Sequence, residues 1–231
     1  VDAAGNLSPD STALAVTTPA APSNSITVDA SVTTKQTAAA SSITSPAFST
    51  TGTNETIVAF LTSDGPNATQ SFSSVTGGGL TWSLKKRVNT QRGTAEIWTA
   101  TASSPLVAAT VKATRSSGSY QGMINVYAFK NAAVGATGGA NAATGAANAS
   151  LVTTRNNAWV WGVGCDWDSA TARTVGSGQT KVQEMLASSG DTFWLQQRSD
   201  PTPTAGTTVQ ISTSAPTNDR WNLALIELIP Q

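Results

Sequence analysis

The segment WNLALIELI, Trp221–Ile229, decides the fold class, because it is apolar on both of the faces that a β-strand presents. We expect it to form a strand that lies centrally in its sheet. No segment of the chain sustains an apolar period of 3.6 residues, which is the pattern of an amphipathic helix. The chain is therefore expected to fold into β-strands.

Outward from this segment, apolar and polar residues alternate with a period of two along much of the chain. The clearest case is the hairpin Thr81–Val88, turn 89–93 and Ala95–Ala100, in which Trp82, Leu84 and Val88 share one face. Further strands are predicted at residues 57–61, 106–114, 122–129, 150–154, 158–167, 179–187, 192–198 and 207–213. Regular spacing with Gly, Pro, Asn and Ser between strands predicts an all-β protein, an antiparallel β-sandwich of jelly-roll or lectin-like type.

The amino-acid composition indicates in which compartment the protein is located and which classes of partner it does not bind. Only 11% of the 231 residues are charged, against roughly 25% on average, and the formal net charge is zero. A nucleic-acid partner is therefore not expected, and membrane insertion is not expected because no apolar run approaches about 18 residues. Low charge is typical of β-rich extracellular proteins, so we expect a secreted or cell-surface location. A start without Met favours a processed secreted protein or a fragment.

The residue types also restrict the chemistry. The chain has no histidine, which removes Ser-His-Asp and Cys-His catalysis and most zinc, copper and iron sites. Cys165 is the only cysteine, so the fold cannot be stabilised by an internal disulfide bond. No catalytic residues are predicted, and a glycosidase or lyase would need two facing acids among only 13.

The segment NAAVGATGGANAATGAANA, residues 131–149, consists almost entirely of small residues. It predicts a flexible surface loop. The alternative is a thin extended segment lying flat against another surface, because tiny side chains permit close approach.

The start of the chain, VDAAGNLSPDSTALAVTTPAAP, resembles the C-terminal end of a bacterial fibronectin type III domain. The match covers the D-A-A-G-N-x-S-P turn, a last strand at Thr12–Thr18 and a Pro/Ala linker. The resemblance implies a parent protein built as a string of secreted β modules. It divides the chain into residues 1–24, a terminal strand and linker, and residues 25–231, the β-sandwich.

A single strand needs a sheet to complete it. Thr12–Thr18 is therefore expected either to fold back onto its own sandwich or to add to a neighbouring copy or β module by β-augmentation. In the second arrangement residues 1–20 are the connector of a homo-oligomer.

The stretch AWVWGVGCDWD, residues 158–168, concentrates tryptophan, cysteine and aspartate. As a strand it places Trp159, Trp161, Val163 and Cys165 on one face, which favours a core position because a free cysteine behaves as a small buried hydrophobe. Asp166 and Asp168 flank Trp167 at its end. They predict either a calcium site or a strand end at which Asp bonds nearby backbone.

Two functions follow as expectations. The first is a non-catalytic extracellular protein of cell-surface adhesion or self-assembly, a filament-type subunit linked through its N-terminal strand. The alternative is a carbohydrate-binding module of a secreted multidomain protein, whose glycan would stack on Trp167, Trp194 and Trp221. Calcium is the only cofactor considered, through Asp166 and Asp168.

Overall fold

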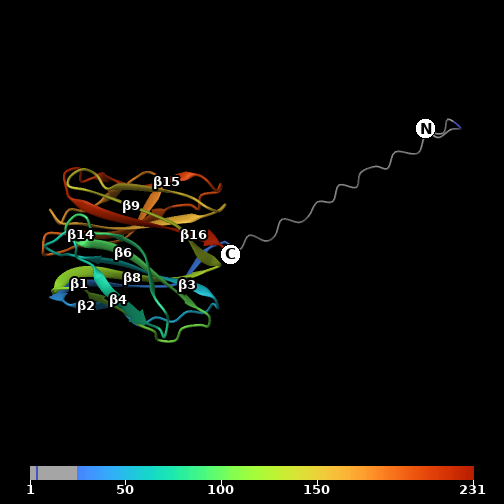
Figure 1. Ribbon diagram of the computed structural model, residues 1–231, viewed down its shortest axis with the longest axis horizontal. Helices are drawn as coiled ribbons and strands as arrows, with labels where there is room; N and C mark the ends of the chain where they lie inside the picture. The colour runs from blue at the N-terminus through green and yellow to red at the C-terminus, as the bar shows by residue number, and fades with distance from the viewer. Residues whose placement is uncertain (1–3, 5–24) are drawn as a thin grey trace.

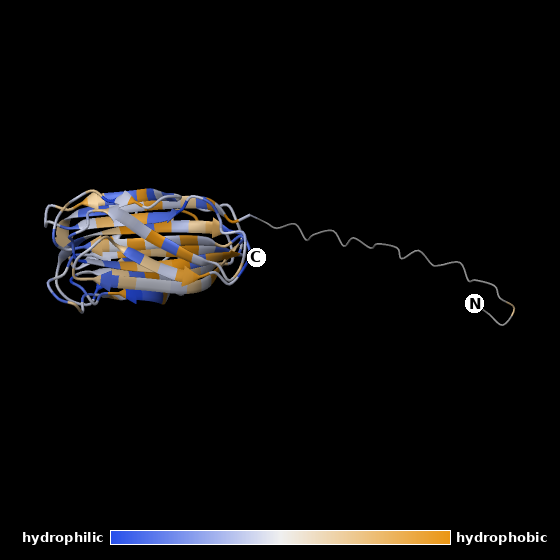
Figure 2. Ribbon diagram, turned by 90° about the horizontal axis from the view of Figure 1, so that it is seen from above, coloured by the Kyte–Doolittle hydropathy of each residue, from blue (hydrophilic) through white to orange (hydrophobic). Residues whose placement is uncertain are grey.

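The computed structural model describes Ala4 and residues 25–231, and over this part of the chain the fold is all-β. The predicted strand at Thr12–Thr18 lies outside the described residues. Among the described residues there is no helix with the length and hydropathy needed to cross a membrane. Apolar residues interleave with hydrophilic ones along the strands (Figure 2).

Residues 27–130, the first half, form two antiparallel sheets. The larger sheet has the order β1-β8-β3-β6-β5 and the smaller one the order β2-β7-β4. The bounds of these strands are β1 Thr27–Ala40, β2 Ser42–Thr44, β3 Glu55–Ser63, β4 Phe72–Gly77, β5 Ser83–Val88, β6 Thr94–Ala102, β7 Val111–Arg115 and β8 Tyr120–Lys130.

Residues 132–230, the second half, repeat this arrangement with the orders β13-β14-β11-β16-β9 and β10-β15-β12. The bounds are β9 Ala132–Ala142, β10 Asn148–Val152, β11 Trp159–Asp166, β12 Thr174–Val175, β13 Gln179–Leu186, β14 Thr192–Arg198, β15 Thr208–Ala215 and β16 Trp221–Pro230. Each strand of the first half thus has a counterpart in the second. The order 1-8-3-6 beside 2-7-4 is that of a jelly roll, with the fifth strand added to the larger sheet.

The register of the strands confirms that the halves are duplicates. On β6, the partner strand β5 shifts its register between Leu84 and Lys86. On β14, the partner strand β13 makes the same shift between Lys181 and Gln183. Where the sequence predicts one sandwich over residues 25–231, the structure therefore contains two.

The four sheets stack in layers, with the two larger sheets in the middle (Figure 1). Three apolar cores separate the layers: one inside each half, and a central one between the halves that contains Phe60, Phe129 and Trp161. The predicted strand at Trp221–Ile229 lies between β11 and β9 and is buried on both faces, as expected. The core positions predicted for Trp161, Val163 and Cys165 are confirmed, and Trp159 packs partly buried beside them.

The prediction of a flexible loop at residues 131–149 is wrong, because most of the segment forms β9 and the start of β10. The alternative, a thin segment lying flat on another surface, describes β9 well. A Cβ atom on Gly139 would lie 2.6 Å from Val88 of β5, and one on Gly138 would lie 2.5 Å from the backbone oxygen of Ser150. Only glycine allows β9 to approach both neighbours this closely.

Glu96 and Glu227 are both fully buried, and a buried carboxylate is ordinarily paired with a Lys or Arg side chain. Glu96 has such a partner, since the Nε atom of Arg87 on β5 donates to it at 2.7 Å. Glu227 does not. It accepts from the backbone N–H groups of Ala136, at 2.7 Å, and Thr154, at 2.6 Å. Hydrogen bonds from β9 and the loop after β10 satisfy this carboxylate instead.

Candidate functional site

The three tryptophans predicted to bind a ligand do not form a common exposed surface. Trp194 is fully buried and Trp221 is 5% exposed, and both pack in the core of the second half. A sugar cannot reach either ring, so the stacking role predicted for Trp194 and Trp221 is wrong. Both residues follow the period-two pattern that puts alternate side chains into a core.

Trp167 lies at the edge where the two halves meet, and it is half-buried. The guanidinium group of Arg92 covers its ring at 3.9 Å from the centroid, and Arg220 lies 6.0 Å away. Its indole also bonds the carboxylate of Asp64, at the end of β3. Trp167 thus connects the second half to two residues of the first, which is a structural role.

The two aspartates predicted as calcium ligands are engaged in other contacts. Asp166 is 1% exposed, forms an ion pair with Arg173, and accepts from the backbone N–H of Thr192 at 3.0 Å. Asp168 is exposed and accepts from the backbone N–H of Arg220 at 2.7 Å. No group of three or more potential metal-ligating side chains occurs among the residues that the structure describes. The strand-end interpretation fits this geometry, and the calcium interpretation does not.

Beside Trp167 lies a cavity of about 230 Å³, lined in part by Asp64, Tyr120 and Ser189. Behind it, Asp191 is 1% exposed and accepts a hydrogen bond from Ser189. Burial is the main cause that raises the pKa of Asp191 to about 7, and the negative charge of Asp64 raises it further. Burial also raises the pKa of Asp64.

Asp191→Asn should stabilise the protein above pH 7 and leave stability nearly unchanged at pH 4. The raised pKa means that the folded state keeps the Asp191 proton which the unfolded state loses above pH 3.8. Stability from this group is therefore complete below pH 3.8 and is lost as pH rises towards 7. The pKa difference corresponds to ~4 kcal/mol, which solvent screening at this edge reduces to about 1–2 kcal/mol. Thermal melts from pH 4 to 8 check this, and an equal effect of the substitution at both pH values would contradict it.

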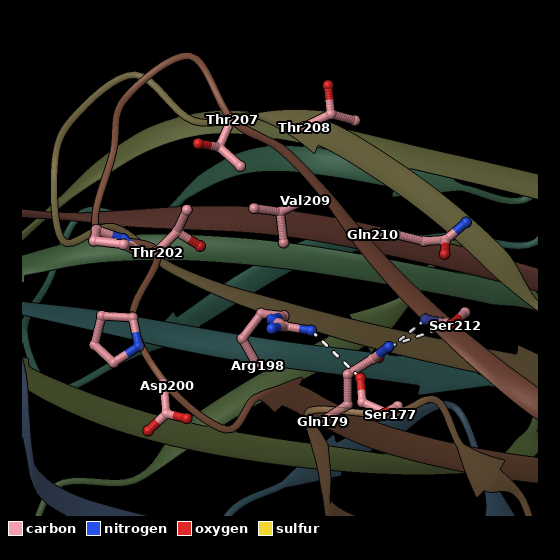
Figure 3. A pocket seen from close by; sticks show the side chains of 12 residues that line it. Ser177, Gln179, Arg198, Asp200, Thr202, Thr207, Thr208, Val209, Gln210 and Ser212 are labelled. Atoms are coloured by element: carbon pink, nitrogen blue, oxygen red, sulfur yellow. Dashed lines mark hydrogen bonds between the residues drawn. The ribbon is translucent and has the colours of Figure 1, made fainter.

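A groove of about 620 Å³ lies beside β15 (Figure 3). The duplication explains its origin. In the first half, β4 pairs with β7 along the whole stretch from Arg115 to Val111. In the second half, β12 pairs with β15 only at Ala215 and Thr213. The groove lies where the rest of this strand would be.

The connection after the short strand is also smaller in the second half. In the first half, residues 78–82 join β4 to β5, and Leu80 and Trp82 pack against the core there. In the second half, only residues 176–178 join β12 to β13. Their sequence, Gly-Ser-Gly, has no large side chain to cover the opening.

The missing strand leaves backbone groups of β15 facing the groove. Backbone atoms of Ser212 are used on this side, by Gln179 and Gly176. Because alternate residues of an antiparallel strand point to the same side, the N–H and C=O groups of Gln210 and Thr208 face the gap. The groove therefore presents an open strand edge.

The side chains of the groove are mainly polar and form a fixed base. Gln179 accepts from the backbone N–H of Ser212 at 3.0 Å and from Nε2 of fully buried Gln196 at 2.8 Å. The carboxamide of Gln179 thus stands in for the backbone of the missing strand. Arg198 and Asp200 supply one positive and one negative charge, and the other lining residues are uncharged: Ser177, Gln179, Pro201, Thr202, Pro203, Thr207, Thr208, Val209, Gln210 and Ser212.

No protein-family model matches this chain, and no curated protein or solved structure matches it. The fold itself defines a class, a duplicated all-β protein of two jelly-roll-type sandwiches packed through their larger sheets. The site is assigned from its own geometry.

Sequence reasoning did not find the groove. The signal available was the similarity of Thr110–Ala113 (TVKA) to Thr208–Ile211 (TVQI), which aligns β7 with β15. Aligned in this way, the second half lacks residues between its short fourth strand and the next one. A search for internal repeats would have shown this difference.

Proposed function

We propose that this chain is a non-catalytic extracellular protein of adhesion or self-assembly that holds its partner in the groove beside β15. The observation that supports this is the open edge of β15 in one half of a duplicated fold whose other half closes the same edge with its own strand. An open strand edge is a template for pairing with another chain. Secretion and a cell-surface location belong to the same proposal, and the low charge of the chain supports them.

In the self-assembly version, the subunits connect through the strand predicted at Thr12–Thr18. Donor and acceptor would then be different surfaces, so the contact is heterologous and gives rings or filaments. Sedimentation velocity and electron microscopy of the full chain test this version. We expect particles larger than a monomer whose share grows with protein concentration.

The matched variants are Val16→Asp and Ala15→Asp, because the period of two puts Leu14 and Val16 on one face of the predicted strand and Ala15 on the other. Val16→Asp should abolish the larger particles and Ala15→Asp should retain them. A full chain that stays monomeric at every concentration contradicts the self-assembly version.

A neutral glycan is the second candidate partner for the groove. The amide and hydroxyl groups of Gln179, Gln210 and Thr202 and the N–H donors of Arg198 favour it, because sugar hydroxyls are bound through such hydrogen-bonding groups. Glycan-array binding that is lost in Arg198→Ala would support adhesion through a glycan. Binding that is unchanged in this variant would place the glycan elsewhere.

A further inference from the structure

The groove in the second half occupies the place at which the first half holds one of its own strands. There, β4 lies antiparallel to β7, with Gly77 opposite Val111 and Val75 opposite Ala113. Val209 and Ile211 of β15 correspond to Val111 and Ala113. The first half therefore shows what fits against this edge.

We infer that the groove binds an extended, uncharged polypeptide segment, which adds to β15 as the missing antiparallel strand. This inference rests on the proposed function, because it names the class of partner for the same site. The segment would pair with the N–H and C=O groups of Gln210 and Thr208. Only a peptide backbone repeats donors and acceptors at the spacing of a strand.

The ends of the open stretch limit the length of the bound segment. At one end, Gly176 and Gln179 already pair with Ser212. At the other end, β15 itself begins at Thr208. Between them, the backbone groups that face the groove are those of Thr208 and Gln210, so the groove accepts a short segment.

The sequence of β4 indicates the preferred side chains. In β4, Phe72 and Val75 are buried in the core of the first half, whereas Ser73 and Thr76 are exposed. The inner face of the groove presents Val209, and its rim carries one positive and one negative charge. A matching partner therefore has an apolar or β-branched residue facing inwards, with Ser or Thr facing outwards and no net charge.

The probe is a labelled, end-capped peptide of residues 71–78 (SFSSVTGG) from this chain, added to the full-length protein and followed by fluorescence polarisation. We expect saturable binding. A peptide with Val75→Asp should bind roughly tenfold more weakly or worse, because it loses the burial of one valine. A peptide with N-methyl groups on its backbone should not bind, since it has lost its backbone donors.

The matched protein variants are Gln210→Pro and Val152→Pro. The first removes an N–H that faces the groove, at an edge position where proline is tolerated. The second removes an N–H of β10 that points away from β15, because Val152 lies opposite Thr208 in the same alternation. Circular dichroism and thermal melts check that both variants are folded, which we expect because each substitution lies at a strand edge.

Loss of peptide binding in Gln210→Pro, with binding kept in Val152→Pro, supports the inference. Equal binding to both variants overturns it, and so does a groove that binds a glycan but no peptide. The proposed function fails separately, if the full chain neither assembles nor binds any glycan or peptide.

Discussion

Trp161→Ala should lower the free energy of unfolding by about 3–5 kcal/mol, the usual range for removing a buried tryptophan. Trp161 is 1% exposed and lies at the centre of the core between the two halves. Its ring centroid is 5.7 Å from that of Phe60, 5.1 Å from that of Tyr127 and 5.3 Å from that of Phe129. The substitution opens a cavity that residues on two sheets would have to fill.

Chemical denaturation followed by circular dichroism measures this change. Trp161→Phe should cost less, because it keeps an aromatic ring in the same place. Val107→Ala is the control, since Val107 is 83% exposed and a surface change of this kind usually stays within about 0.5 kcal/mol. A loss below about 1 kcal/mol for Trp161→Ala would mean that the packing of the halves contributes little to stability.

Asp166→Ala should lower the free energy of unfolding by about 3–5 kcal/mol, because it removes one of the two carboxylates that pair with a buried cation. The side chains of Asp166 and Arg173 are both fully buried and form an ion pair. Without Asp166, the guanidinium group keeps Asp219 at 3.3 Å, and the backbone N–H of Thr192 loses its acceptor. The charge of Arg173 remains, since its pKa is lowered by burial only to about 10.

The control is Asp168→Ala, two residues along the same segment. Its carboxylate is 4.0 Å from Nε of Arg220 at the surface, so the ion pair is worth less than about 1 kcal/mol. Melts with and without added calcium distinguish a structural role of Asp166 from a role in binding the ion. Added calcium should leave the thermal midpoints of the wild-type protein and both variants unchanged. A calcium-dependent rise in the wild type that disappears in Asp166→Ala would restore the metal interpretation.

The duplication gives equivalent positions that differ in chemistry. Glu96 on β6 and Trp194 on β14 both point from a larger sheet towards the smaller sheet of their half. In the first half Arg87 neutralises the carboxylate, whereas in the second half Arg173 lies over the indole ring at 4.8 Å. Substitutions of this size hide the repeat in the sequence, while the strand order and the register shifts preserve it.

The period-two alternation of apolar and polar residues predicts strands correctly where a strand has one or two apolar faces. Strands predicted from it, such as Trp221–Ile229 and residues 192–198, are confirmed as β16 and β14. The alternation does not reveal a strand whose side chains are mostly small or polar. β9 looked like a loop because glycine and alanine carry no hydrophobic signal, and β1 (TVDASVTTKQTAAA) was not predicted because threonine, serine and alanine fill most of it.

The amino-acid sequence by itself determined the all-β class, the core role of Trp161 and Cys165, and the absence of histidine chemistry. These properties depend on residue types and on the local alternation of faces, which are present in the chain before it folds. Only the tertiary structure decided that there are two sandwiches, that Asp166 is paired with Arg173, and that β15 has an open edge beside Gln210. These properties depend on pairing between strands far apart in the chain, which alternation along one strand does not specify.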